Sequence, residues 1–170
     1  GALLHTFAGH SVPIWSIAIS PDGSLLASGS GDGTARLWDM RTGQLRHILS
    51  GHTRELSEVL FNPGGTILAT GAWEGIVRLW DPRTGIPIGT LNDTRRWVAG
   101  IEFSPDGLFL AIAGGYSAIK IWDMRTRELH STLGRDGNER SAMAFSPDGS
   151  SFVGSDSGNT IKLWDVKSSR

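Results

Sequence analysis

The dipeptide Trp-Asp decides the fold of this chain, because it recurs four times, as Trp38-Asp39, Trp80-Asp81, Trp122-Asp123 and Trp164-Asp165. Successive copies are separated by one constant step. A turn motif keeps the same step, reading Ser-Pro-Asp-Gly at residues 20–23, 104–107 and 146–149, and Asn-Pro-Gly-Gly at 62–65. Four units of this length fill almost the entire chain. We therefore treat the chain as one domain with four repeats, at residues 1–42, 43–84, 85–126 and 127–170.

Each repeat predicts four short β-strands and no helix. Pro and Gly in the Ser-Pro-Asp-Gly segment favour a type I turn between two antiparallel strands. In the third predicted strand, positions 35 and 37 are apolar, while Arg36 and Trp38 share the other face. Both faces are partly apolar, which is typical of a sheet packed between two others, and the long arginine stem can extend outward. A period of about 40 residues with several strand signals therefore predicts an all-β fold of four propeller blades.

Composition excludes several classes of protein. The 39% hydrophobic content indicates a folded chain, and 16 basic against 17 acidic residues leave no overall field to attract nucleic acid or an anionic membrane. With no cysteine, the chain has no disulfide, thiolate nucleophile or cysteine-based zinc site. No stretch resembles a signal peptide or a membrane span. We expect a cytoplasmic location without membrane contact.

Sequence motifs for catalysis, cofactors and metals are also missing. The glycines at 31 and 33 precede a predicted strand, whereas a phosphate-binding loop needs a helix there. The aspartates fall in turns or at strand ends, and His5, His47 and His130 are interpreted as surface residues. The predicted inner strands bring mainly small residues to the central channel, with Glu102 as the charged exception. We expect no catalytic residue, no cofactor and no metal ligand.

The first repeat resembles the WD-repeat β-propeller family in Gly9-His10, the Ser-Pro-Asp-Gly turn, the Leu-Ala-Ser-Gly-Ser run at 26–30, Asp32 and Trp38-Asp39. In that family a histidine, a serine or threonine, an aspartate and the tryptophan form a buried hydrogen-bonded tetrad within a blade. The resemblance implies a tetrad of His10, Ser28 or Ser30, Asp32 and Trp38. In the second repeat it implies His52, Thr70, Glu74 and Trp80. These residues are expected to be structural.

The tetrad decays in the second half of the chain. The third and fourth repeats carry Thr94 and Asp136 at the histidine positions, and Tyr116 and Gly158 at the aspartate positions, with Asp156 two residues away. A buried polar chain stabilises only when every member finds a partner. We therefore predict that the first two repeats are the more rigid half.

The order of predicted strands bears on how the ring closes. Residues 3–7, Leu-Leu-His-Thr-Phe, match the outermost strand that precedes each Gly-His position, whereas the fourth repeat lacks an outer strand after residues 160–165. This resembles the family's velcro closure, in which one end of the propeller completes the other. One chain could close as four blades, two chains could close head to tail as eight, or the chain could be a fragment of a longer propeller. We expect the two-chain, eight-bladed ring, because closed cyclic symmetry is common.

A candidate binding face follows from the tetrad, since the turns that carry its histidine and aspartate must share one face of the disk. Residues on that face that the repeat does not dictate are Trp15, Arg54, Glu55, Trp73, Arg95, Arg96, Trp97, Tyr116 and Glu139. Aromatics and arginines are typical anchors of protein interfaces. In the alternative interpretation, the tryptophans pack on adjoining loops and the charges are solvated.

Arg95-Arg96-Trp97 could also contact nucleic acid, but one basic pair is a narrow positive surface, and Glu55, Glu58 and Glu139 lie in equivalent loops. We predict a noncatalytic scaffold that binds a protein or peptide and also a second copy of itself, head to tail. The alternative is a self-assembling half-propeller, a fragment or an engineered chain, without a specific partner.

Overall fold

The computed structural model describes residues 1–92, 96–134, 142–155 and 159–166. Among these residues it contains fifteen β-strands and no helix. The first sheet consists of β1 (Ile14–Ile19), β2 (Leu25–Ser30), β3 (Ala35–Asp39) and β4 (Leu45–Leu49). The second consists of β5 (Leu56–Phe61), β6 (Leu68–Ala72), β7 (Ile76–Trp80) and β8 (Pro87–Asn92).

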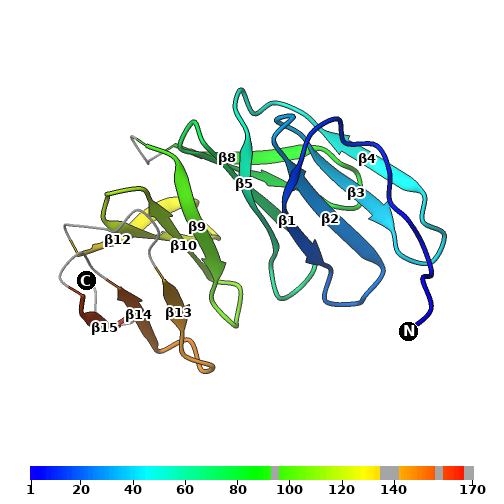
Figure 1. The fold of residues 1–170 in the computed structure, drawn as a ribbon. Helices are drawn as coiled ribbons and strands as arrows, with labels where there is room; N and C mark the ends of the chain where they lie inside the picture. Colours follow the sequence, from blue (N-terminus) through cyan, green and yellow to red (C-terminus); the bar gives the residue numbers. More distant parts are fainter. Residues whose placement is uncertain (93–95, 135–141, 156–158, 167–170) are drawn as a thin grey trace.

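The third sheet consists of β9 (Val98–Phe103), β10 (Phe109–Gly114), β11 (Ile119–Asp123) and β12 (Glu128–Leu133). The fourth has the three strands β13 (Met143–Phe145), β14 (Ser151–Ser155) and β15 (Ile161–Asp165). Every sheet is antiparallel, with neighbouring strands consecutive in sequence. The four sheets follow one another in an open arc, so the predicted four-blade, all-β architecture is confirmed and the sheets are not closed into a ring within this chain (Figure 1).

The Ser-Pro-Asp-Gly segments form the turns between the first two strands of their blades. In the first, Gly23 has a positive φ of 73°, and its N–H donates to the Ser20 carbonyl at 2.8 Å. The Ser20 hydroxyl donates to Asp22 at 2.6 Å, which locks the turn from within. In the variant motif of the second repeat, the Asn62 side-chain oxygen accepts from the N–H groups of Thr66 and Ile67. The weaker sequence therefore keeps the same connection.

The hydrophobic cores lie between neighbouring sheets. Ala27, Ala35, Leu37 and Leu49 of the first sheet pack against Leu56, Val59, Phe61, Leu68 and Trp80 of the second. Corresponding side chains fill the next two interfaces, around Leu79 with Ile101 and around Ile121 with Phe152. Each internal sheet buries both faces, which explains why the strands alternate between two apolar surfaces.

The predicted outer strand at residues 3–7 is not formed within this chain, and its pairing with a second copy stays a prediction. Residues 1–13 form no strand, and Leu3 and Leu4 are exposed. A strand needs a ladder partner, and β3, the nearest blade's third strand, already pairs with β4. Phe7 nevertheless lies edge-on to Trp38, with ring centroids 5.8 Å apart. The segment therefore lies along the first blade without joining its sheet.

Candidate functional site

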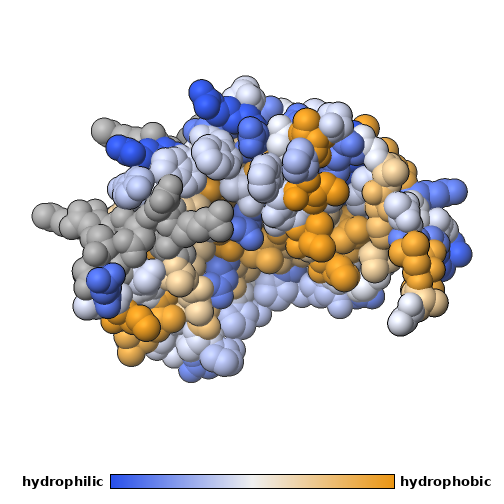
Figure 2. All heavy atoms as spheres, viewed as in Figure 1, coloured by the Kyte–Doolittle hydropathy of each residue, from blue (hydrophilic) through white to orange (hydrophobic). Residues whose placement is uncertain are grey.

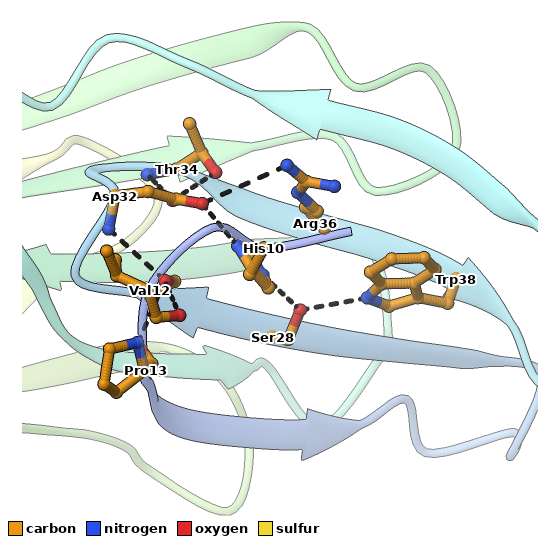
Figure 3. A network of polar contacts seen from close by, with 9 residues as sticks. His10, Val12, Pro13, Ser28, Asp32, Thr34, Arg36 and Trp38 are labelled. Atoms are coloured by element: carbon orange, nitrogen blue, oxygen red, sulfur yellow. Dashed lines mark hydrogen bonds and ion pairs between the residues drawn. The ribbon is translucent and has the colours of Figure 1, made fainter. Parts of the chain in front are cut away.

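The first blade contains a continuous polar chain (Figure 3). Trp38 Nε1 donates to Ser28 Oγ at 2.9 Å, Ser28 Oγ lies 2.8 Å from His10 Nε2, and His10 Nδ1 lies 2.8 Å from Asp32 Oδ2. Ser30, the alternative hydroxyl, donates instead to the carbonyls of Val12 and Pro13. Ser28 is thus the hydroxyl that joins the tryptophan to the histidine.

The second blade contains the same chain with a glutamate at its end. Trp80 Nε1 donates to Thr70 Oγ1 at 2.9 Å, Thr70 Oγ1 lies 2.7 Å from His52 Nε2, and His52 Nδ1 lies 2.6 Å from Glu74 Oε1. Since an indole can only donate, we assign the Thr70 proton to His52 Nε2 and the histidine proton to Nδ1, which satisfies every member. Burial lowers the pKa of His52, in agreement with a neutral ring.

The longer glutamate also reaches a neighbouring loop. Its second oxygen accepts from the backbone N–H of Thr53 at 2.9 Å and of Arg54 at 2.7 Å. Burial tends to raise the pKa of Glu74, but the hydrogen bonds from His52 and from the backbone N–H groups of Arg54 and Thr53 outweigh it, so the net pKa is lowered. Glu74 therefore fixes the loop that presents Arg54 and Glu55.

In the first blade the aspartate closes a turn of its own. Oδ1 of Asp32 accepts from the N–H and hydroxyl of Thr34, at 2.9 and 2.6 Å. Burial tends to raise the pKa of this carboxyl, but the hydrogen bonds from Thr34 and His10 outweigh it and lower the pKa to about 2. Arg36 does not extend outward: it is mostly buried, with its guanidinium 4.0 Å from Asp32. Gly9 leaves room for it, since a Cβ there would collide with the guanidinium.

The third and fourth blades lack the hydroxyl link. The register that places Ser28 opposite Arg36 and Thr70 opposite Arg78 puts Ile112 opposite Lys120 and Gly154 opposite Lys162. Within the part of the chain that the structure describes, the buried Trp122 Nε1 has no hydrogen-bond partner. Sequence reasoning noted the lost histidines and acids but missed this hydroxyl. The substituted positions Thr94, Asp136, Asp156 and Gly158 lie outside the described residues.

The exposed aromatic side chains gather at one place. A cavity of about 480 Å³, which we call the aromatic groove, is lined by Trp15, Trp73 and Trp97 together with Ser16, Ser57, Glu58, Val98 and Ala99. Trp15 belongs to β1, Trp73 to the turn between β6 and β7, and Trp97 immediately precedes β9. The groove therefore spans three consecutive blades.

Ring contacts and backbone hydrogen bonds hold these aromatics in place. Trp73 and Trp97 are stacked, with centroids 5.9 Å apart and planes 23° apart, and Tyr116 meets Trp97 edge-on at 5.7 Å. The Trp73 N–H donates to the Glu55 carbonyl, and the Gly115 N–H to the Trp97 carbonyl, both at 2.9 Å. A Cβ at position 115 would overlap the Trp97 ring, so Gly115 is required for this arrangement. Trp15 is nevertheless 60% exposed and Trp73 52% exposed.

The predicted charged residues lie around the groove. Arg54 and Glu55 line a neighbouring cavity of about 490 Å³ that shares Trp73. The Arg96 guanidinium lies over the Tyr116 ring, 5.6 Å from its centroid. Arg95 and Glu139 lie outside the described residues. The structure thus brings the described members of the predicted face into one surface, whereas its use for binding stays a prediction.

Two kinds of contact were not predicted from the sequence, where His5, His47 and His130 were interpreted only as surface residues. Nε2 of His5, His47 and His130 contacts a backbone carbonyl 36 residues later in each case, at 3.1–3.3 Å in Arg41, Arg83 and Val166. The spacing of 36 residues between each histidine and its partner carbonyl is the same in all three contacts. The partner atom belongs to the backbone, however, so no pattern of residue types marks it.

The second contact joins inner strands. Val59 N–H donates to Ser16 Oγ at 3.1 Å, and Phe145 N–H donates to Glu102 Oε1 at 3.2 Å. Burial raises the pKa of Glu102, and the Phe145 hydrogen bond only partly opposes this. Glu102, the charged residue expected in the channel, therefore supports the neighbouring strand.

The described residues contain no cluster of three or more side chains that could hold a metal ion. The same residues include no helix long and apolar enough to cross a membrane.

Comparison with known proteins agrees with this geometry. The crystal structure of the computationally designed Ika4 protein superimposes with a TM-score of 0.85 and 27% identity, over 97% of this chain and 98% of that one. Among curated proteins, eukaryotic translation initiation factor 3 subunit I of Neurospora crassa is 49% identical over 45 residues, and that of Neosartorya fischeri is 48% identical over 44. Each match covers 26% of this chain and 13% of the subunit.

A family model described as "WD domain, G-beta repeat" matches four times, at residues 1–39, 43–81, 85–123 and 128–165. Each match contains the first three strands of one sheet, and the second, third and fourth matches begin with the outer strand of the preceding sheet, β4, β8 or β12. Together the matches cover most of the chain. The chain therefore belongs to the WD-repeat family.

Proposed function

We propose that this protein is a noncatalytic scaffold that binds a protein or peptide segment in the aromatic groove. The observation that carries the proposal is the exposure of Trp15 and Trp73 around a cavity of about 480 Å³. Large aromatic side chains cost free energy when they face water, and exposed apolar patches mark interaction sites. Tryptophan and arginine are also the residues that contribute most to binding at protein interfaces.

The construction of the groove suits a docking surface. Its residues are held by sheets that pack on one another, and Trp73 and Trp97 are already stacked. A preformed site loses little conformational entropy on binding. The likeness to an initiation factor subunit supports protein partners, since a subunit by name assembles with other proteins. Nucleic acid and membrane are not proposed as partners, and a cytoplasmic location remains part of the proposal.

Peptide display tests the scaffold function without knowledge of the natural partner. Peptides from a randomised library would be selected on the wild type, and their affinities for wild type and Trp73→Ala/Trp97→Ala compared by calorimetry. We expect selected peptides to lose at least about tenfold in affinity, because each tryptophan at the centre of an interface contributes about 1–2 kcal/mol or more. Equal affinity for both proteins would show that the proposed face is wrong.

A second candidate function, assembly of a closed ring with another copy, is favoured by the two ends of the arc. Ile17 on β1 is 67% exposed, whereas Val59 and Ile101, its equivalents in the next two blades, are 2% and 6% exposed. Leu163 on β15 is 70% exposed, whereas Leu79 and Ile121 are fully buried. Figure 2 shows hydrophobic atoms over β1 and near β15.

These two faces are equivalent to the two sides of each internal interface between blades. At each internal interface, the side chains equivalent to Leu163 pack against those equivalent to Ile17 of the next blade. A second copy would place its β15 face on β1 of the first, and the reverse contact would close eight blades with cyclic symmetry. Phe7 lies against Trp38 and would, in this proposed ring, add to the outer part of that interface.

Light scattering behind size-exclusion chromatography tests this closure. We expect the wild type to have a mass of twice 18.3 kDa. Ile17→Glu and Leu163→Glu, on opposite ends of the arc, should each give the monomer mass, because both changes bury a charge at the same kind of contact. Ile86→Glu is the matched control, since Ile86 is exposed away from both ends. A monomeric wild type would contradict the two-chain ring.

A further inference from the structure

We infer that the aromatic groove binds an uncharged, proline-rich segment of its partner in the extended polyproline II conformation. The inference rests on the proposed scaffold function and names the kind of segment that this site recognises.

The groove combines large aromatic surfaces with open space. Ser57 and Ala99 occupy the positions of the second and third blades that are equivalent to Trp15 in the first, so one blade supplies a bulky side chain where the next two leave room. The stacked pair Trp73 and Trp97 forms a further part of the lining. Grooves lined by aromatic rings are the surfaces on which proline-rich segments dock, because the polyproline II helix is already extended and loses little entropy on binding.

The exposed indoles present hydrogen-bond donors. An indole can only donate, and Trp38 and Trp80 use their N–H groups inside the blades. The indole N–H groups of Trp15 and Trp73, both more than half exposed, donate to no acceptor within the described part of the chain. A ligand that offers acceptors therefore matches these two side chains.

The polar side chains of the lining are already engaged. Ser16 Oγ accepts from the Val59 N–H at 3.1 Å, the Ser57 hydroxyl donates to the Gly71 carbonyl at 3.2 Å, and Glu58 has a partner of its own. A peptide N–H brought into the groove would compete for these groups, and a buried donor without a partner costs free energy. Proline has no backbone N–H, so a proline-rich segment brings carbonyl acceptors and few donors.

The charges beside the groove favour an uncharged segment. Arg54 and Glu55 line the neighbouring cavity, Arg96 lies over Tyr116, and Glu58 belongs to the lining itself. Because both signs are present, the surface favours neither an acidic nor a basic partner. A proline-rich segment carries no charge and fits this balance.

Indole resonances provide a direct test. The chain has seven tryptophans, so a ¹H–¹⁵N spectrum resolves the groove indoles from the buried Trp38 and Trp80, which report on the fold. The probes are three capped peptides, Ala-X-X-Ala-X-X-Ala, in which X is proline, alanine or valine. Valine has as many carbon atoms as proline but keeps the N–H. We expect the proline peptide to shift the indoles of Trp15 and Trp73, and to bind at least about tenfold more tightly than the other two.

A variant identifies the indole donor. Trp15→Phe keeps an aromatic ring but removes the N–H, and it should weaken binding of the proline peptide about fivefold. Trp122→Phe is the matched control on β11, since Trp122 Nε1 has no hydrogen-bond partner among the described residues, and it should leave binding unaltered.

Three results would overturn the inference and leave the scaffold function standing. They are binding of the alanine or valine peptide as tight as that of the proline peptide, shifts with none of the three peptides, and unchanged affinity in Trp15→Phe. Peptides selected by display on the wild type should likewise be enriched in proline. If the selected peptides failed to depend on Trp73 and Trp97, the scaffold function would fall separately.

Discussion

Replacing Thr70 with valine tests whether the polar chain stabilises its blade. Thr70 is fully buried, its hydroxyl accepts from Trp80 Nε1 at 2.9 Å, and it lies 2.7 Å from His52 Nε2. Valine has nearly the same shape, so the change creates almost no cavity. It leaves one buried donor and one buried acceptor without a partner, each costing about 1–3 kcal/mol. We therefore expect the free energy of unfolding to fall by about 2–6 kcal/mol.

Urea denaturation followed by far-UV circular dichroism measures this loss. Thr90→Val on β8 is the matched control, because Thr90 belongs to the same blade and is exposed, and its effect should stay within about 0.5 kcal/mol. If Thr70→Val costs no more than the control, the hydrogen-bonded chain does not stabilise the blade and our reasoning is refuted.

Three further predictions concern ionisation and local stability. The lowered pKa of Glu74 contributes stability that is fully present above the ordinary value of 4.5 and is lost as pH falls through the folded value. The difference in unfolding free energy between wild type and Glu74→Gln should therefore shrink below about pH 4.5. A constant difference in urea midpoint would argue against this prediction. The pKa of Glu102 is shifted in the opposite direction: it is raised, so the folded state holds the proton more tightly than the unfolded state. Glu102→Gln should therefore be more stable than wild type at about pH 7, and the difference in unfolding free energy should shrink as pH falls toward 4.5. A variant that is less stable than wild type at about pH 7 would contradict this prediction. Hydrogen exchange should show slower amide exchange in β6, whose blade has a complete tetrad, than in β10, whose blade lacks the hydroxyl; equal protection would remove the link between tetrad and rigidity.

Much of the fold could be predicted because each repeat has the same residue types at corresponding positions. The evenly spaced Trp-Asp pairs and the Pro-Gly turns identify the blades, and the alternation around Leu37 predicts two packed faces. The choice between Ser28 and Ser30 could not be made, since both have the same parity along β2 and only the position of the histidine loop decides. Residues 3–7 form no strand within this chain, because a strand depends on a ladder partner as well as on its own residues.

The residues of the candidate site could be predicted from the sequence, but their arrangement could not. The rule that histidine and aspartate turns share a face placed Trp15, Trp73 and Trp97 together, and the structure shows them around one cavity. The stacking of Trp73 on Trp97 depends on Gly115, which reads in the sequence as an ordinary turn glycine. The hydrogen bond between Glu74 and the backbone N–H of Thr53 depends on side-chain length and on distance in three dimensions. Residue spacing in the sequence therefore does not predict it.

A crystal structure of the protein with a display-selected peptide tests the central claim, that the aromatic groove is the docking site, most directly. We predict that the peptide lies against Trp15, Trp73 and Trp97, with a side chain inside the cavity between β1, β5 and β9. A peptide bound along the open edge of β15, or on the outer strands with the groove empty, would contradict the account.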